Sequence, residues 1–295
     1  MVGEPSHLQI ITAHKGLMAF QLALHFTPLA ANAAFEAQRV AFFGKAAHSS
    51  TPALGDNAIV KALAAMASRP KVHLCAIEGG DAVNKVPARC EVIVAAALAA
   101  SLGGVPGEHA GPRENFIPAE AIAALSQFVA ALNEFADRTG PAEPDYAAPT
   151  LTCNPGVIRT VGGDSITLEF ELRPPPSLAL DPVRKGVAAI VDRIAYGAPN
   201  VQFSLTEKRA NPGFRSPAAS ETVELAMGAL AQAGLALESG VKAGCTEAGI
   251  YAAAGLKPVV FGPGPSTGVI HAPNEYNLLS EVEGAVRFYR ALLAM

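Results

Sequence analysis

An α/β layer interrupted by an inserted α+β domain is the fold class that this sequence of 295 residues predicts. Through the first two hundred residues, β-rich apolar runs are mixed with amphipathic helical segments. The last eighty residues or so follow a helix–strand–helix order, which is typical of one piece of an α/β layer. A short apolar run from Leu8 to Ile11 can add a strand to that piece. We therefore expect a partial, discontinuous α/β domain at 1–16 and 211–295 and a ferredoxin-like α+β domain at 17–210.

The individual elements follow from hydrophobic periodicity and from the Gly and Pro residues that flank it. In the inserted part, strands are expected at 17–26, 40–43, 72–77 and 90–97, on both sides of Gly162-Gly163 within 157–172, and at 201–205. Helices are expected at 57–68, 118–138 and 182–196, and Gly/Pro-rich loops at 101–117 and 140–150. The C-terminal part should contain helices at 220–233, 245–254 and 280–293 and a buried strand at 258–261.

The composition excludes several classes of protein. Half of the residues are hydrophobic and only 16% are charged, so a sizeable core can form and part of the apolar excess can lie in a subunit interface. The net charge of −4 without a basic run argues against a nucleic-acid partner. No run of about 20 apolar residues predicts a membrane span, and the first residues lack the features of a signal peptide. Four cysteines without a CxxC pair indicate reduced thiols and a cytoplasmic protein.

Five residues in loops or at a strand end have side chains suited to chemistry. Glu4, stiffened by Pro5, and His271, placed after a Gly-Pro-Gly turn, are carboxylate and imidazole donors of the kind that zinc binds. His48 lies on a Gly/Ser/Thr-rich loop and can polarise a carbonyl, and the amide of Asn84 can donate to an oxyanion. Arg173 ends a strand, where a guanidinium can bind a carboxylate with two hydrogen bonds. Each residue also has a plain structural interpretation, as an exposed turn or loop residue.

The motifs taken together resemble the zinc aminoacylases and deacylases, which include acetylornithine deacetylase, succinyl-diaminopimelate desuccinylase and glutamate carboxypeptidases. The motifs that carry the resemblance occur in family order along nearly the whole chain: Gly3-Glu4-Pro5-Ser6, Ala13-His14-Lys15-Gly16, Gly44 to Ile59 around Ala47-His48-Ser49-Ser50, Gly79-Gly80-Asp81-Ala82 with Asn84 and Pro87, Cys245-Thr246-Glu247-Ala248, and Gly262-Pro263-Gly264 followed by His271, Pro273 and Glu275-Tyr276. The last two motifs are most similar to the acetylornithine deacetylase branch.

This resemblance implies roles for residues at the matching positions. Glu4 and His271 would each bind one metal of a two-zinc site, in which cobalt can replace zinc. His48 and Asn84 would come from a lid domain that also dimerises, and they would approach the substrate carbonyl. Substrate-binding roles would fall to Arg173, which would bind the carboxylate, and to a pocket set consisting of Thr246, Glu247 and Gly264.

This sequence departs from the family pattern in its metal-binding and general-base motifs. Family members carry a His-x-Asp metal motif, a bridging Asp and a Glu-Glu pair whose first member is the general base, and this sequence contains neither His-x-Asp nor Glu-Glu. We therefore expect an incomplete metal site, poorly occupied in this chain alone, and an activity that depends on an N-terminal segment.

Three hypotheses follow for the function. The chain is part of a metal-dependent hydrolase of N-acyl amino acids, such as N-acetylornithine; or it is one half of a split enzyme; or it is a non-catalytic dimerisation or binding protein. An in-frame His-x-Asp and Glu-Glu in the DNA before Met1 would favour the first hypothesis, and a separate neighbouring reading frame the second. The acyl group, the amino acid and the metal are not determined by the sequence.

Overall fold

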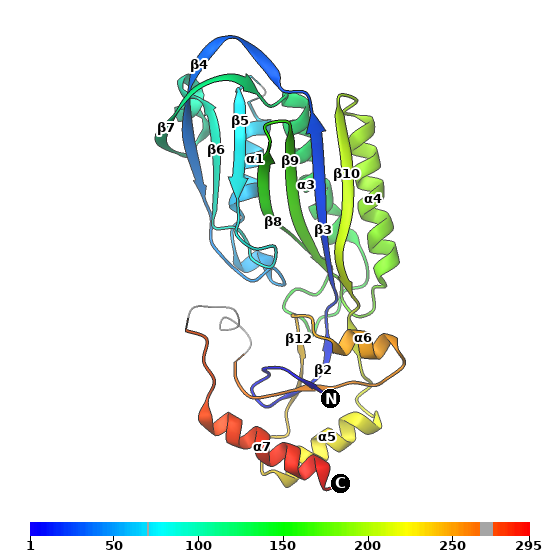
Figure 1. Ribbon diagram of the computed structural model, residues 1–295. Coiled ribbons are helices and arrows are strands. Elements are labelled where there is room, and N and C mark those ends of the chain that lie inside the picture. Colours follow the sequence, from blue (N-terminus) through cyan, green and yellow to red (C-terminus); the bar gives the residue numbers. More distant parts are fainter. Residues whose placement is uncertain (70, 266–273) are drawn as a thin grey trace.

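The computed structural model describes residues 1–69, 71–265 and 274–295 and contains two β-sheets, one above the other in Figure 1. We call residues 17–211, which hold the larger sheet, the lid, and residues 1–16 and 212–295 the platform. The lid sheet has eight strands in the order β10-β3-β9-β8-β5-β6-β4-β7, and the platform sheet has the path β1-β13-β2-β11, with β12 paired to β2. A ferredoxin-like βαββαβ unit has four strands, so the lid sheet is larger than that expectation.

The lid contains most of the regular structure. Its strands are β3 (Leu17–Phe26), β4 (Leu29–Phe43), β5 (Leu74–Gly79), β6 (Arg89–Ala95), β7 (Val105–Phe116), β8 (Thr152–Val161), β9 (Ser165–Arg173) and β10 (Val201–Asn211). Its helices are α1 (Ala58–Ala67), α2 (Ala96–Ala99), α3 (Ala119–Arg138) and α4 (Leu180–Tyr196), with short 3-10 turns at Pro52–Leu54 and Ala100–Leu102.

The three long helices of the lid cover one face of its sheet (Figure 1). Phe170 on β9 lies 5.3 Å from the ring of Phe128 on α3 and is stacked on Phe20 of β3 at 5.4 Å. Alternate residues of β9 are therefore committed to this core, because successive side chains of a strand point to opposite faces. The intervening residues, including Glu171 and Arg173, lie on the other face.

The loop expected at 101–117 is wrong, because β7 occupies most of it and pairs antiparallel with β4. Pro106, Gly111 and Pro112 suggested a loop, but an edge strand tolerates such residues because one side of it makes no ladder hydrogen bonds. The register of β4 against β7 shifts three times, which accommodates the irregular backbone. Strand β4 likewise begins at Leu29, much earlier than position 40, through a stretch that is largely exposed.

The platform is built from shorter elements. Its strands are β1 (Val2–Gly3), β2 (Ile10–His14), β11 (Phe214–Arg215), β12 (Ser239–Lys242) and β13 (Val260–Phe261), and its helices are α5 (Glu221–Gln232), α6 (Ala248–Ala253) and α7 (Leu279–Leu293). Phe261 stacks on Phe288 of α7 with ring centroids 3.8 Å apart, which joins the sheet to that helix. None of the helices among the described residues is long and apolar enough to cross a membrane.

The chain passes between lid and platform at two adjacent points, after β2 and after β10. Gly16 and Gly213 approach each other there so closely that a Cβ on either one would lie 2.9 Å from the other's backbone nitrogen. Gly16 also donates its N–H to the carbonyl of Pro174 at 2.8 Å. Since real Cβ contacts are rarely so short, small residues at both positions permit the two crossings to lie side by side.

Candidate functional site

His48 belongs to the loop between β4 and α1. Figure 1 shows this loop at the end of the lid that faces the platform. The backbone N–H of Ser50 donates to Nδ1 of His48 at 3.1 Å, and the Ser50 hydroxyl lies 2.7 Å from the same atom. A nitrogen that accepts from an amide carries no proton, so in the neutral ring the proton is on Nε2. The exposed imidazole is thereby held as an Nε2–H tautomer, which can donate to a carbonyl oxygen.

Asn84 lies beside this loop, in the connection between β5 and β6. Its carbonyl accepts from the N–H of Ser49 at 3.1 Å, and the next residue, Lys85, forms an isolated β-bridge with His48. The half-buried side-chain amide of Asn84 makes no hydrogen bond with the described residues. Two positions separated by 36 residues in sequence are thus brought into adjacent loops, and their role as oxyanion donors stays a prediction.

The loop that carries Asn84 is anchored to the sheet by a second asparagine. Asn154 on β8 donates from its side-chain amide to the carbonyl of Val83 at 3.0 Å and to that of Lys85 at 2.8 Å, on either side of Asn84. Its Oδ1 accepts from Asn57, whose own Oδ1 caps the first turn of α1. No local pattern distinguishes Asn154, because its amide bonds backbone groups of a distant loop.

Arg173 ends β9 and is almost completely buried, at 5% exposure. Its Nε donates to Oε1 of Glu171 at 2.8 Å, and the hydroxyl of Ser49 donates to the same carboxylate oxygen. The two terminal nitrogens of Arg173 make no hydrogen bond within the described part of the chain. Because a guanidinium has five donors, this leaves a pair of them for a carboxylate ligand.

His14, which the sequence analysis used only as part of a motif, has a structural role in the platform. It is fully buried, its Nε2 accepts from the N–H of Thr246 at 3.1 Å, and its Nδ1 lies 2.9 Å from the carbonyl of Lys15. Burial lowers the pKa of His14 from 6.5 to about 4, so the ring is neutral and its proton is on Nδ1. His14 therefore fixes the loop that contains the expected substrate-binding residues.

The expected substrate-binding residues Thr246 and Glu247 differ in their surroundings. The hydroxyl of Thr246 accepts from the N–H of Ala248, at the start of α6, and Thr246 is only 4% exposed. Glu247 is exposed at the N-cap position of α6. Thr246 thus supports the loop, while the carboxylate of Glu247 is the group accessible to a ligand; their substrate-binding roles stay predictions.

Lys15, named above only within the motif Ala13-His14-Lys15-Gly16, is a buried lysine in the structure. Its ammonium is buried, donates to the carbonyl of Thr150 at 2.6 Å, and lies 5.8 Å from the ring centre of Tyr146. Burial lowers the pKa of Lys15 to about 8, although the nearby Glu143 raises it and Arg173 lowers it further. Only the tertiary contact with 143–150 distinguishes this lysine from an exposed one.

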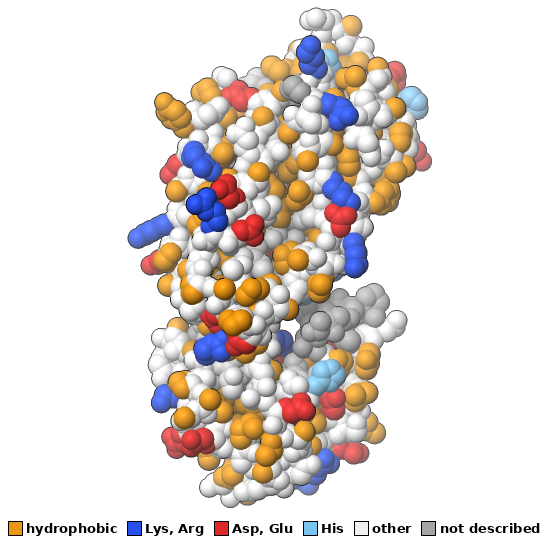
Figure 2. All heavy atoms as spheres, turned by 180° about the vertical axis from the view of Figure 1, so that it is seen from behind, with side chains coloured by type: hydrophobic (Ala, Val, Ile, Leu, Met, Phe, Trp, Pro, Cys, Tyr) orange, Lys and Arg blue, Asp and Glu red, His pale blue; other side chains and the backbone are white. Residues whose placement is uncertain are grey.

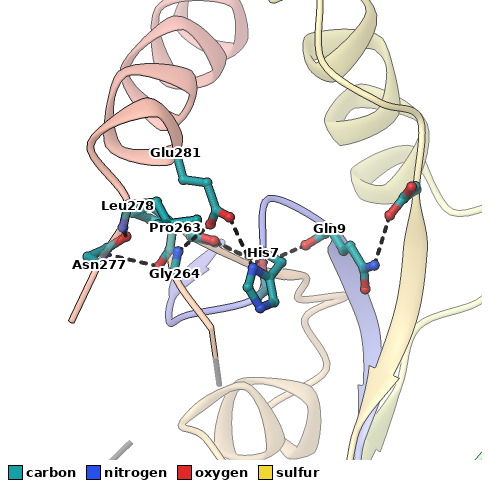
Figure 3. Close-up of polar contacts among 10 residues, drawn as sticks. His7, Gln9, Pro263, Gly264, Asn277, Leu278 and Glu281 are labelled. Atoms are coloured by element: carbon teal, nitrogen blue, oxygen red, sulfur yellow. Dashed lines mark hydrogen bonds and ion pairs between the residues drawn. The ribbon is translucent and has the colours of Figure 1, made fainter. Parts of the chain in front are cut away.

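Gly264 occupies a turn that is held on two sides, as Figure 3 shows. Its N–H donates to Oε2 of Glu281 at 2.6 Å, and its carbonyl accepts from the N–H of His7 at 3.0 Å. The backbone φ of +94° and the side chain of Asn277, 3.0 Å from a Cβ built here, both favour glycine. A substrate contact through this N–H would have to replace the bond to Glu281, and the substrate-binding role stays a prediction.

The expected metal ligands do not form a site within the described residues. Oε2 of Glu4 lies 3.5 Å from Nζ of Lys242, whose positive charge opposes a cation at the same oxygen. His271 lies outside the described residues. Over residues 1–69, 71–265 and 274–295, no group of three or more His, Cys, Asp or Glu side chains is arranged to hold a metal ion. A catalytic zinc site needs three protein ligands, so this donor set does not fit one.

Three comparisons place the chain among known proteins. Residues 32–101 match the peptidase dimerisation domain. A probable carboxypeptidase from Aspergillus fumigatus is 27% identical over 195 residues, which are 59% of this chain and 38% of that protein. A probable carboxypeptidase from Neosartorya fischeri is 31% identical over 133 residues, or 38% of this chain and 25% of that protein. The crystal structure of aminoacylhistidine dipeptidase from Vibrio alginolyticus matches with a TM-score of 0.68 and 20% identity, over 99% of this chain and 64% of that one.

The structural match shows that the chain has the fold of the corresponding part of that dipeptidase, and the matched region covers less than two thirds of each relative. The dimerisation-domain match at residues 32–101 and the similarity to probable carboxypeptidases agree with the resemblance that the motifs carry. The relatives are carboxypeptidases and a dipeptidase, and they give no support to the acetylornithine deacetylase branch.

Proposed function

We propose that the chain forms the lid and part of the platform of a hydrolase that cleaves the amide bond of an N-acyl amino acid or a short peptide with a free carboxylate. The observation that carries the proposal is the convergence of three groups at one end of the lid. These groups are the Nε2–H imidazole of His48, the side-chain amide of Asn84 and the guanidinium of Arg173. Hydrogen bonds connect the His48 loop to the Asn84 loop and, through Glu171, to Arg173 at the end of β9.

Each group has a distinct task in this proposal. Arg173 binds the carboxylate of the substrate through its terminal nitrogens. His48 and Asn84 donate hydrogen bonds to the carbonyl oxygen of the scissile amide and stabilise the negative charge that develops on it. Glu247 lines the pocket from the platform, where it is exposed. Carboxypeptidase and dipeptidase relatives favour a peptide substrate, and the sequence motifs favour an N-acyl amino acid such as N-acetylornithine.

A substrate panel distinguishes these classes. Hydrolysis of N-acetylornithine, of other N-acetyl amino acids, of aminoacyl-histidine dipeptides and of longer peptides should be compared, with the carboxamide of each as a control. The assay should use the chain supplied with Zn²⁺ or Co²⁺ and, in parallel, the product translated in frame from the DNA that precedes Met1. A requirement for the free carboxylate supports the proposal, and no hydrolysis of any substrate in either preparation would leave the non-catalytic alternative.

Substitutions of His48 and Arg173 test the roles proposed for these two residues. We expect His48→Ala to lower kcat about 100-fold with little change in KM, because it removes a donor to the developing oxyanion. Arg173→Lys should mainly raise KM, about tenfold or more, because an ammonium cannot form the two parallel bonds of a guanidinium. His25→Ala is the matched control, since His25 is an exposed histidine on β3, away from the loops that carry His48 and Asn84. Equal effects of His25→Ala and His48→Ala would contradict the assignment.

We also propose, from the resemblance and not from the described donors, that the working enzyme uses zinc with Glu4 and His271 as one ligand each. Since Glu4 is paired with Lys242, the chain alone should bind zinc weakly and should not hydrolyse N-acetylornithine. Zinc titration by calorimetry should show weak binding that is reduced in Glu4→Ala, which removes a ligand of one metal, and unchanged in Glu238→Ala, a platform carboxylate bonded to Gln9. Tight binding that survives Glu4→Ala would contradict this ligand assignment.

The lid is the proposed dimerisation surface. Its residues 32–101 match a dimerisation domain, and β7 and β10 are the two edges of its sheet. An isologous homodimer is the simplest arrangement for one such surface per chain. Sedimentation of the whole chain at increasing micromolar concentration tests this proposal, and a mass that stays monomeric throughout would contradict it.

A further inference from the structure

The carboxylate of Glu171 connects the proposed carboxylate-binding residue of the lid with the loop of its proposed oxyanion donor. Oε1 of Glu171 accepts from Nε of Arg173 at 2.8 Å and from the hydroxyl of Ser49, the residue after His48. Glu171 is 1% exposed, and a carboxylate so deeply buried is stable only when it is paired and hydrogen-bonded. The same oxygen therefore contacts both the proposed carboxylate-binding residue and the loop of the proposed oxyanion donor.

The position of Glu171 in the sheet extends this link to the other loop. Glu171 on β9 is directly opposite Asn154 on β8, and opposite residues of an antiparallel pair point to the same face. Asn154 holds the backbone on both sides of Asn84, while Glu171 holds Ser49. Two facing positions on neighbouring strands thus fix the two donor loops.

The bond to Nε also determines how Arg173 is presented. Glu171 uses one edge of the guanidinium, and the terminal nitrogens at the other end make no hydrogen bond among the described residues. A planar guanidinium held at Nε cannot rotate freely, so the direction of its remaining donors is fixed. Without that bond, a long side chain would lose part of its affinity to the ordering of its rotamers.

We propose that Glu171 is a positioning residue that sets Arg173 and the His48 loop at a fixed separation, so that a substrate bound by its carboxylate presents its carbonyl to His48. This inference rests on the proposed function for the identity of the ligand, but the positioning itself is a property of the chain. It assigns to Glu171 a role that requires its charge toward Arg173 and its acceptor oxygen toward Ser49.

NMR of the whole chain can test the contact of Glu171 with Ser49 and its contact with Arg173 separately, with one variant for each. Ser49→Ala removes only the tie to the loop, and we expect amide exchange at Ser50 and Thr51 to become about tenfold faster and the His48 ring to populate both tautomers. Glu171→Gln keeps an acceptor but removes the charge, and the Nε–H of Arg173 should exchange about tenfold faster. Ser165→Ala, a buried serine at the opposite end of β9 that bonds Val161, is the control and should change neither signal.

Ligand binding tests whether Glu171 affects the binding of a carboxylate by Arg173. We expect Glu171→Gln to weaken the binding of N-acetylglycine about tenfold, and to leave any binding of N-acetylglycinamide, which has no carboxylate, unchanged. Unchanged or tighter binding of N-acetylglycine, or unchanged exchange at Arg173 and in the Ser49→Ala loop, overturns the positioning role. If the unsubstituted chain binds neither compound while the exchange rates respond as expected, the positioning stands and the carboxylate ligand of the proposed function is wrong.

Discussion

The lid and the platform differ in how much hydrophobic core they bury. Among the residues that the structure describes, the lid holds one cluster of 42 buried hydrophobic residues, whereas the platform holds two clusters of 10 and 5. On α7 of the platform, a row of apolar side chains at helical spacing is exposed: Leu279, Val282, Val286, Tyr289 and Leu293. Figure 2 shows hydrophobic side chains on the surface of both halves of the molecule. Because buried apolar area is the main source of stability, the platform should be the less stable region.

Because of this difference in packing, we expect the lid residues of the candidate site to be held more rigidly than its platform residues. His48, Asn84 and Arg173 are presented by the well-packed lid, through side-chain bonds to β8 and β9. Glu4 and Glu247 belong to the platform, whose strands have two to five residues. We therefore expect the lid part of the site to persist under conditions that loosen the platform part.

The largest expected effect comes from a truncation in the lid core. Phe170→Ala should lower the free energy of unfolding of the lid by about 3–5 kcal/mol, because it removes a fully buried ring and leaves a cavity between Phe20 and Phe128. Urea unfolding followed by hydrogen exchange measures the loss separately in each region. Phe288→Ala in the platform is the counterpart and should affect only platform amides. If it destabilised the lid equally, the two regions would form a single cooperative unit.

A smaller effect should appear as a pH dependence confined to the platform. The pKa of His14 is about 4 in the folded chain and 6.5 as the ordinary value, so between these values the unfolded state binds a proton that the folded state does not. Stability should therefore be complete above pH 6.5 and fall as the pH drops toward 4, by about 3 kcal/mol from this residue alone. Urea titrations of the unsubstituted chain and His14→Gln at pH 7 and pH 4 test this. The variant should lose less stability between the two pH values; an equal loss would show that His14 is not responsible.

The smallest expected loss of stability comes from replacing the residue that precedes a helix, and it should differ between α1 and α5. Asn57 accepts from the N–H groups of Ile59 and Val60 at the start of α1 in the lid, whereas Ser220 makes no capping bond at the start of α5 in the platform. Asn57→Ala should cost about 1 kcal/mol or slightly more, because it also removes the bond to Pro155, and Ser220→Ala should cost less than about 0.5 kcal/mol. Thermal unfolding measures both values. A cost at Ser220 equal to that at Asn57 would show that the capping bonds do not distinguish the two helices.

The sequence alone determined the elements whose periodicity is strong. Strand β3 and helices α1, α3, α4 and α7 lie within about two residues of their expected ranges, because an amphipathic pattern specifies both the element and its buried face. The family motifs likewise indicated His48 and Asn84 as a pair before any geometry was known, and the structure places their loops side by side. Strand β7 was missed because edge pairing with β4, and not its own Gly- and Pro-containing sequence, makes it a strand.

The polar residues that support the candidate site could not be identified without the tertiary structure. Glu171 and Asn154 have no distinguishing local pattern, and the motif around Lys15 does not predict its burial, since each of the three residues depends on a partner 69 to 135 residues away in sequence. His14 and Thr246 stood in recognisable motifs, yet their mutual hydrogen bond and the low pKa of His14 exist only because β2 is buried against the loop before α6. Burial and long-range hydrogen bonds depend on how distant segments pack, and a local pattern of side chains carries no information about that packing.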